Sequence, residues 1–69
     1  MFREYLEKIE REEDVRMNLI ELRKLLKTEP GNAAWQRDRQ RCLSLMLKLL
    51  KHEDAKVRKN AALILGEMG

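Results

Sequence analysis

Three side chains in the second half of the chain, Cys42, Ser44 and His52, are of the types that perform nucleophilic catalysis. A thiol or hydroxyl becomes reactive when a histidine within hydrogen-bond distance takes its proton. All three lie on or beside one predicted helix, whose rise per residue places Ser44 and His52 roughly 12 Å apart. The sequence therefore predicts no enzyme active site.

Metal binding and acid–base chemistry are not predicted either. The chain has one cysteine and one histidine, whereas a structural zinc ion takes four ligands. We expect Cys42 to be a buried core thiol and His52 a solvated turn residue. The carboxylates of residues 4–14 have the pattern of a solvated acidic face, and the three glycines are isolated, so no phosphate-binding loop is expected. No metal and no cofactor are predicted.

Charge is divided unevenly along the 69 residues. The net charge is +3, but residues 1–14 have three basic and six acidic side chains, and the remainder has twelve basic and six acidic ones. Basic residues could bind phosphates, with Trp35 stacking on a base. Aromatic residues are few, however, and a helical rotation of about 100° per residue scatters Arg37, Arg39 and Arg41 over two sides. A protein partner is favoured, with nucleic acid as the alternative.

Hydrophobic residues at helical spacing predict the elements that position these side chains. Apolar residues recur every three or four positions over residues 2–11, 15–27, 33–51 and from residue 55 onwards, which puts each set on one helical face. The second half of 33–51 is apolar around most of its circumference, so that helix must be covered on more than one side. The predicted fold class is all-α with four helices.

Residues 28–32 are the strongest helix-breaking segment. Pro30 cannot continue a helix, and glycine and asparagine tolerate a left-handed turn. We therefore predict a linker at 28–32 between a helix pair at 1–27 and a second pair at 33–69. Asp14 and Asn32 are expected to cap the second and third helices.

A short motif occurs twice, 42 residues apart. Its two copies are Val15-Arg16-x-Asn18 and Val57-Arg58-x-Asn60. Each copy follows acidic residues and opens an amphipathic helix with the same apolar spacing. The first helices of the two pairs align at an offset of 41, which matches Ile9 with Leu50. A period of about 40 to 47 residues is typical of two-helix solenoids.

The second copy resembles the second-helix signature of HEAT repeats, especially the bacterial type related to phycobilisome-lyase repeats. The residues that carry the resemblance are Asp54, Val57, Arg58, Ala61, Ala62, Leu65 and Gly66. The match is clear over residues 43–69 and weaker over 2–27, where Lys24 stands in the place of the glycine, as in a degenerate amino-terminal capping pair. The resemblance implies an α-solenoid of two antiparallel helix pairs, whose second helices line the concave side.

Each signature residue has a physical role in this interpretation. Asp54 can pair with Arg58 or bind free amides at the start of the last helix, and Arg58 can reach the acidic turn of a neighbouring unit. Ala62 and Gly66 form a stripe without bulk that admits another helix. We therefore expect the amino-terminal piece of a longer array, which alone is marginally stable or self-associates through its fourth helix.

The expected function is a scaffold or adaptor that is not an enzyme and binds another macromolecule. The candidate partner-binding residues lie on the two second helices and are Met17, Glu21, Lys24, Lys56, Lys59 and Leu63. Two alternatives stay open. One is the nucleic-acid-binding part of a HEAT-like enzyme with catalytic residues outside this chain, and the other is a self-contained four-helix bundle or dimer. No segment resembles a secretory signal or a membrane span, so a cytoplasmic setting is expected.

Overall fold

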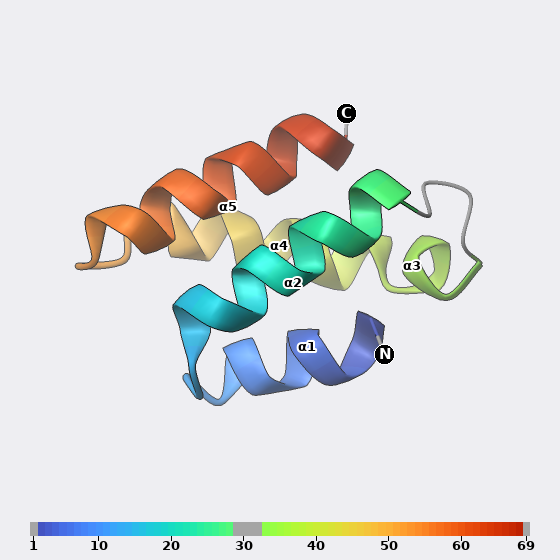
Figure 1. The fold of residues 1–69 in the computed structure, drawn as a ribbon, viewed down its shortest axis with the longest axis horizontal. Coiled ribbons are helices and arrows are strands. Elements are labelled where there is room, and N and C mark those ends of the chain that lie inside the picture. The colour runs from blue at the N-terminus through green and yellow to red at the C-terminus, as the bar shows by residue number, and fades with distance from the viewer. Residues whose placement is uncertain (1, 29–32, 69) are drawn as a thin grey trace.

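The computed structural model describes residues 2–28 and 33–68, which form five helices and no strand. The helices are α1 (Phe2–Glu10), α2 (Val15–Thr28), α3 (Ala33–Arg37), α4 (Arg39–Leu49) and α5 (Ala55–Met68). α1 packs against α2 and α3, whereas α5 packs against α2 and α4. Figure 1 shows α1 and α5 on opposite sides of α2, with α4 behind. The all-helical prediction is confirmed.

The boundaries of three helices lie close to those predicted. α1 ends one residue before the predicted end, α2 continues one residue further to Thr28, and α5 begins at Ala55 as expected. The rest of the predicted linker, including the proposed cap Asn32, lies outside the described residues. Within the residues that are described, no helix has the length and apolar character needed to cross a bilayer.

The predicted single helix over residues 33–51 is wrong, because it is interrupted at Asp38. This residue has φ −99° and ψ 13°, and its amide donates to the carbonyl of Trp35 three residues back, a tighter turn than in an α-helix. Both residues are held by α1. The rings of Phe2 and Trp35 lie 5.9 Å apart, and Arg3 donates to both carboxylate oxygens of Asp38 at 3.3 and 3.4 Å. These tertiary contacts explain a break that helical periodicity does not predict.

The core is built from the apolar faces of all five helices. Its buried residues are Phe2, Leu6, Ile9, Leu19, Leu22, Leu26, Trp35, Cys42, Leu45, Met46, Leu49, Val57, Ala61, Ile64 and Met68. Within each of the longer helices these residues recur every three or four positions. The hydrophobic spacing in the sequence therefore identified the buried faces of α1, α2 and α5 correctly.

The buried face of α4 lies one residue away from its predicted register. Ile9 of α1 is 1% exposed, and its predicted counterpart Leu50 is 37% exposed, whereas Leu49 is only 5% exposed. Burial therefore aligns the two first helices at an offset of 40 and not 41. One residue corresponds to a rotation of about 100°, so a stripe of leucines on α4 lies at the margin of the core and is partly exposed. The stripe consists of Leu43, Leu47 and Leu50.

The turn between α1 and α2 is stabilised by Asn18. Asp14 has φ 43°, in the left-handed region, and the buried Asn18 side chain donates to the carbonyls of Glu13 at 2.9 Å and Asp14 at 3.0 Å. The predicted cap was the Asp14 side chain; the structure instead has Asn18 reaching back from within α2. Asn60, the matching residue of the second motif, likewise donates to the carbonyl four residues before it at 3.0 Å.

Candidate functional site

α2 and α5 lie side by side and are joined by two ion pairs (Figure 1). Arg16 Nε lies 2.6 Å from Asp54 Oδ2 near the start of both helices. Arg23 Nη2 lies 3.9 Å from Glu67 Oε1 near their ends. The helices therefore run parallel, and each pair links the same end of α2 and α5.

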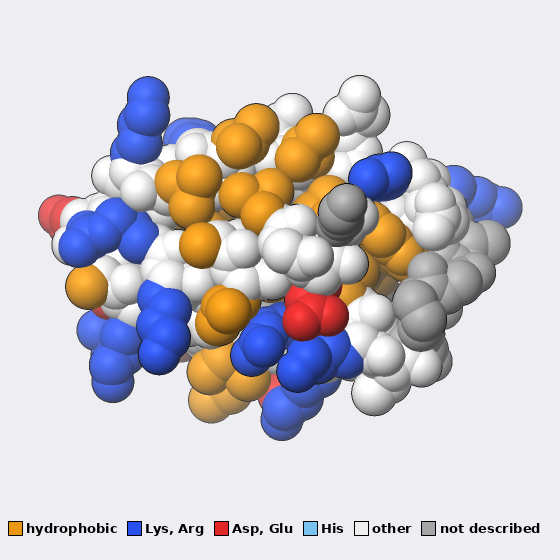
Figure 2. All heavy atoms as spheres, turned by 90° about the horizontal axis from the view of Figure 1, so that it is seen from above, with side chains coloured by type: hydrophobic (Ala, Val, Ile, Leu, Met, Phe, Trp, Pro, Cys, Tyr) orange, Lys and Arg blue, Asp and Glu red, His pale blue; other side chains and the backbone are white. Residues whose placement is uncertain are grey.

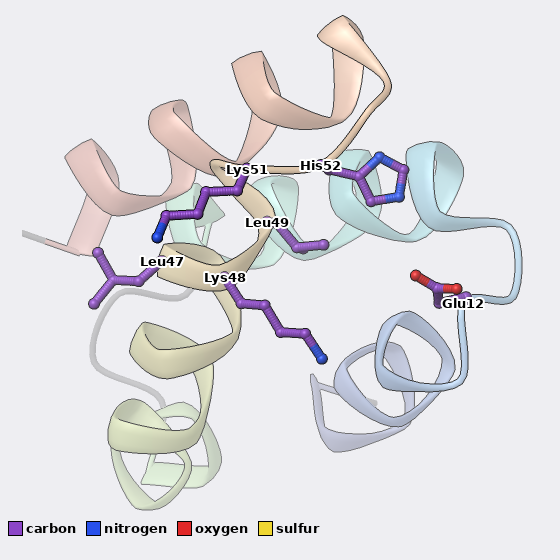
Figure 3. A pocket seen from close by; sticks show the side chains of 6 residues that line it. All are labelled: Glu12, Leu47, Lys48, Leu49, Lys51 and His52. Atoms are coloured by element: carbon purple, nitrogen blue, oxygen red, sulfur yellow. The ribbon is translucent and has the colours of Figure 1, made fainter.

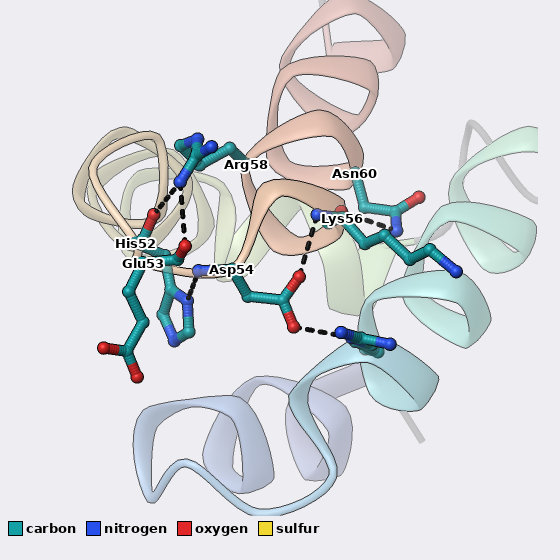
Figure 4. A network of polar contacts seen from close by, with 7 residues as sticks. His52, Glu53, Asp54, Lys56, Arg58 and Asn60 are labelled. Atoms are coloured by element: carbon teal, nitrogen blue, oxygen red, sulfur yellow. Dashed lines mark hydrogen bonds and ion pairs between the residues drawn. The ribbon is translucent and has the colours of Figure 1, made fainter.

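Asp54 uses both of its carboxylate oxygens at this junction (Figure 4). Oδ1 accepts a hydrogen bond from the amide of Lys56 at 2.9 Å, which caps α5, while Oδ2 accepts one from Arg16. The Asp54 amide in turn donates to Nδ1 of His52 at 3.0 Å. The hydrogen bond from Arg16, opposed by partial burial, lowers the pKa of the Asp54 carboxyl below its ordinary value of 3.8.

Of the two roles expected for Asp54, binding a free amide of α5 is observed, and pairing with Arg58 is not. Arg58 Nη1 donates to the carbonyls of His52 at 2.7 Å and Glu53 at 3.0 Å, so the guanidinium binds the turn before its own helix (Figure 4). The partner of Asp54 is Arg16, which holds the place of Arg58 in the first copy of the repeated motif. Arg16, the arginine of the first copy of the motif, thus reaches the acidic turn of the following helix pair.

We expect acid to weaken the α2–α5 junction through Asp54. Because its folded pKa is lowered, its contribution to stability is present above its unfolded pKa and is lost as the pH falls through the folded value. Urea unfolding across about pH 2 to 6 should therefore show a smaller acid loss of stability in Asp54→Asn, with the two curves meeting at low pH. Glu53→Gln is the control in the same turn. Parallel curves for the Asp54→Asn variant and the parent chain would contradict the assignment.

The predicted binding surface on α2 has an exposed apolar centre. Met17 is 60% exposed and Ile20 is 41% exposed. Both line a shallow hollow of about 340 Å³ with Asp14, Val15 and Arg16. Ile20 was missed by the sequence analysis, although its position three residues after Met17 puts the two on one side of the helix.

The remaining predicted partner-binding residues have different degrees of exposure. Lys24 is exposed and its ammonium lies 3.6 Å from the carboxylate of Glu21, which is half-buried. On α5, Lys56 and Lys59 are exposed, and Figure 4 shows the Lys56 side chain extending toward α2. Leu63 is half-buried and so offers less surface than expected.

Trp35 and two of the arginines near it, which were considered for nucleic-acid binding, are engaged within the chain. Trp35 is 7% exposed and packs on Phe2, and the Arg39 guanidinium lies 5.8 Å from its ring centre. Arg41 binds Glu10 through two hydrogen bonds of 2.9 and 2.6 Å, which lower the pKa of that carboxyl and raise that of the guanidinium. A covered tryptophan and a paired arginine are poorly placed to bind bases and phosphates.

The side chains considered for catalysis do not assemble. Cys42 is fully buried as predicted, and burial, with the nearby charge of Asp38, raises the pKa of its thiol to about 12. A thiol with this pKa stays protonated at neutral pH. Ser44 is exposed, and His52 is half-buried and hydrogen-bonded in its turn, where a solvated residue was predicted.

A second hollow, of about 560 Å³, lies beside the end of α4 (Figure 3). Its lining residues are Glu12, Leu47, Lys48, Leu49, Lys51 and His52. Figure 3 shows Lys48 and Glu12 pointing toward one another across it. Among the described residues no group of three histidine, cysteine or carboxylate side chains is placed to hold a metal ion.

The HEAT-like signature residues divide between the core and the surface. Val57 and Ala61 are buried, at 1% and 0% exposure. Ala62 and Gly66 are exposed, and a Cβ added at Gly66 would meet nothing within 4 Å. Leu65 is half-buried. No helix of the described chain packs on the small-residue stripe.

The chain matches no protein-family model, no curated protein and no solved structure. The class defined by the coordinates is a small all-helical protein with an exposed α2–α5 surface. The likeness to HEAT repeats depends on the sequence motif alone. Any function must therefore be argued from the surfaces described above.

Proposed function

We propose that this chain is a HEAT-like helical scaffold that binds another protein along the surface formed by α2 and α5. The arrangement of the helices supports this proposal. α2 lies between α1 and α5, and the parallel second helices are joined by the Arg16–Asp54 pair (Figure 1). A closed bundle that packs the first helix on the last would not separate α1 from α5 in this way.

The observation that carries the proposal is the exposure of Met17 and Ile20 together in one hollow. Single exposed apolar residues are common on protein surfaces and need no explanation. Two neighbouring ones in a concave site have the anatomy of a small protein interface. The complementary partner would insert an apolar side chain between Met17 and Ile20.

Site-specific photocrosslinking tests this proposal. A benzoylphenylalanine in place of Met17 should capture a protein from a cell extract, and Ile20→Asp in the same chain should abolish the product. The matched control places the crosslinker at Glu4, an exposed position on α1. Both side chains are exposed and lie outside the buried core, so circular dichroism should report an unchanged fold.

The outcomes separate the candidate functions. A product at position 17 that depends on Ile20 supports the proposed surface. Equal capture at positions 4 and 17, or no capture, would reject it. Capture of nucleic acid, with binding that weakens steeply as salt is added, would favour the alternative function instead.

A further inference from the structure

One side of α4 is apolar and faces away from α1. The Arg41–Glu10 ion pair identifies the side of α4 that faces α1. At about 100° per residue, Leu50 lies nine positions and roughly 180° from Arg41. Leu43 and Leu47 share that side, and Leu47 is 51% exposed. The leucine stripe of α4 is therefore turned away from the first helix pair.

The neighbouring side of α5 is also uncovered. Glu67 faces α2 through its pair with Arg23. Leu65 and Arg58 are two and nine residues from Glu67, which places both roughly 160° to 180° around the helix. Ala62 lies between them and is exposed. Figure 2, viewed from the α5 side, shows hydrophobic side chains gathered side by side on this face.

We call this surface the open face. It consists of Leu43, Leu47, Leu50, Ala62 and Leu65. Its margin is cationic, because Arg58 is exposed beside it and Figure 3 shows Lys51 on the same side of α4 as Leu47. The occupant of the open face should therefore combine apolar side chains with carboxylates.

The contact between the two helix pairs shows how these positions are used. At the offset of 40, Leu43 and Leu50 correspond to Arg3 and Glu10 of α1, the two residues that bind the α3–α4 segment. At the offset of 42, Arg58 corresponds to Arg16, which binds the acidic turn before α5. Leu43 and Leu50 of the open face, with Arg58 at its margin, thus occupy positions through which the first helix pair contacts the second.

The first helix pair carries acidic and apolar groups that complement the open face. The turn before α2 contains the three acidic residues Glu12, Glu13 and Asp14, all exposed. Further along the same two helices, Tyr5 and Leu25 pack against the core but stay half-buried, and the helical rotation from Arg3 and Arg23 places them on the sides of α1 and α2 turned away from the second pair. Apolar groups are therefore available on the side of the first pair turned away from the second, and the acidic turn joins the two helices of that pair.

We propose that the open face binds the α1–α2 pair of a second copy of this chain, head to tail, with the acidic turn of one copy beside Arg58 of the other. Charge complementarity favours this arrangement over a twofold dimer, which would bring the cationic margins of two open faces together. A head-to-tail contact leaves one open face and one acidic turn free at the ends, so association continues beyond the dimer. This inference concerns a different surface from the α2–α5 site and does not depend on the partner proposed there.

Sedimentation velocity over about 10 µM to 1 mM chain tests the proposal. The weight-average mass should rise with concentration and exceed that of a dimer. Leu47→Glu should leave a monomer throughout, whereas Met17→Glu, an equally exposed position on the other surface, should associate like the parent chain. A parent chain that stays monomeric across the whole range would overturn the proposal.

Charge reversal distinguishes a head-to-tail contact from a twofold one. Arg58→Glu and the double variant Glu12→Lys/Glu13→Lys should each weaken association about tenfold or more. Mixing the two variants should restore assembly. The Arg58→Glu chain keeps its acidic turn, and this turn can bind Arg58 of the Glu12→Lys/Glu13→Lys chain. Association of Arg58→Gln should also be weaker than that of the parent chain. Because glutamine keeps a hydrogen-bond donor for the carbonyls of this turn, this variant controls for a loss of fold in Arg58→Glu. Assembly that stops at a dimer and is insensitive to the Glu12/Glu13 reversal would reject the head-to-tail contact.

Discussion

Replacing Leu22 with alanine should leave a large part of this protein unfolded at about 25 °C. Leu22 is 0% exposed at the centre of α2, the helix that contacts both α1 and α5. Removing a buried leucine side chain costs about 2 to 5 kcal/mol, because the neighbouring atoms fill the cavity only in part. A core of this size supplies about 3 to 5 kcal/mol in total. Urea titration followed by circular dichroism measures the loss.

Leu47→Ala is the matched control for this experiment. It removes the same atoms from a leucine that is 51% exposed, so at micromolar concentration its free energy of unfolding should stay within about 0.5 kcal/mol of the parent chain. The contrast between two identical substitutions measures burial alone. If both variants lost the same free energy of unfolding, burial of Leu22 in the core would not be what stabilises the protein.

The helices of this protein could be predicted from its sequence because three of them have separated apolar and polar faces. In α1, buried Leu6 and Ile9 alternate with charged residues, so only one register satisfies the pattern. α2 and α5 follow the same rule with the spacing 0, 4, 7 and 11. Burial at these positions agrees with the prediction from Val57 to Met68.

The register of α4 could not be predicted in this way. Leucine or methionine stands at nearly every position from 43 to 50, so adjacent registers place similar apolar surface in the core. The contacts of α1 with Asp38 and Arg41 select one of them. Those ion pairs join residues about 30 positions apart, and their geometry is fixed only after the helices have packed.

The exposure of one candidate-site residue was predicted from the sequence, but the neighbouring contacts were not. Helical spacing identified Met17 as an outward-facing residue, which its exposure confirms, but passed over Ile20. The motif suggested that an arginine meets an acidic turn. It did not indicate that Arg16 takes Asp54 while Arg58 binds the carbonyls of its own turn. Arg16 binds an acidic turn because a helix pair packs beside it, and no helix of the described residues packs beside Arg58 in the same way. The packing of helix pairs is a property of the tertiary structure.

Removing Arg3 should destabilise the protein more than its exposure suggests. Arg3 is 58% exposed, but its partner Asp38 has a side chain that is only 10% exposed. Arg3→Met deletes both hydrogen bonds to that carboxylate and leaves it with restricted access to water. The expected loss of unfolding free energy is about 1 to 3 kcal/mol, the usual cost of an unsatisfied buried polar group. Urea unfolding at neutral pH measures it.

Two comparisons isolate the cause of that loss. Arg11→Met removes an arginine of similar exposure whose partner Glu13 is itself 53% exposed, so its effect should stay within about 0.5 kcal/mol. Asp38→Asn in the Arg3→Met background replaces the stranded charge with a neutral amide and should recover part of the stability. If Asp38→Asn lowers stability further in that background, the carboxylate is stabilised by groups other than Arg3. The break between α3 and α4 would then owe its position to the local backbone at Asp38 and not to the pair with α1.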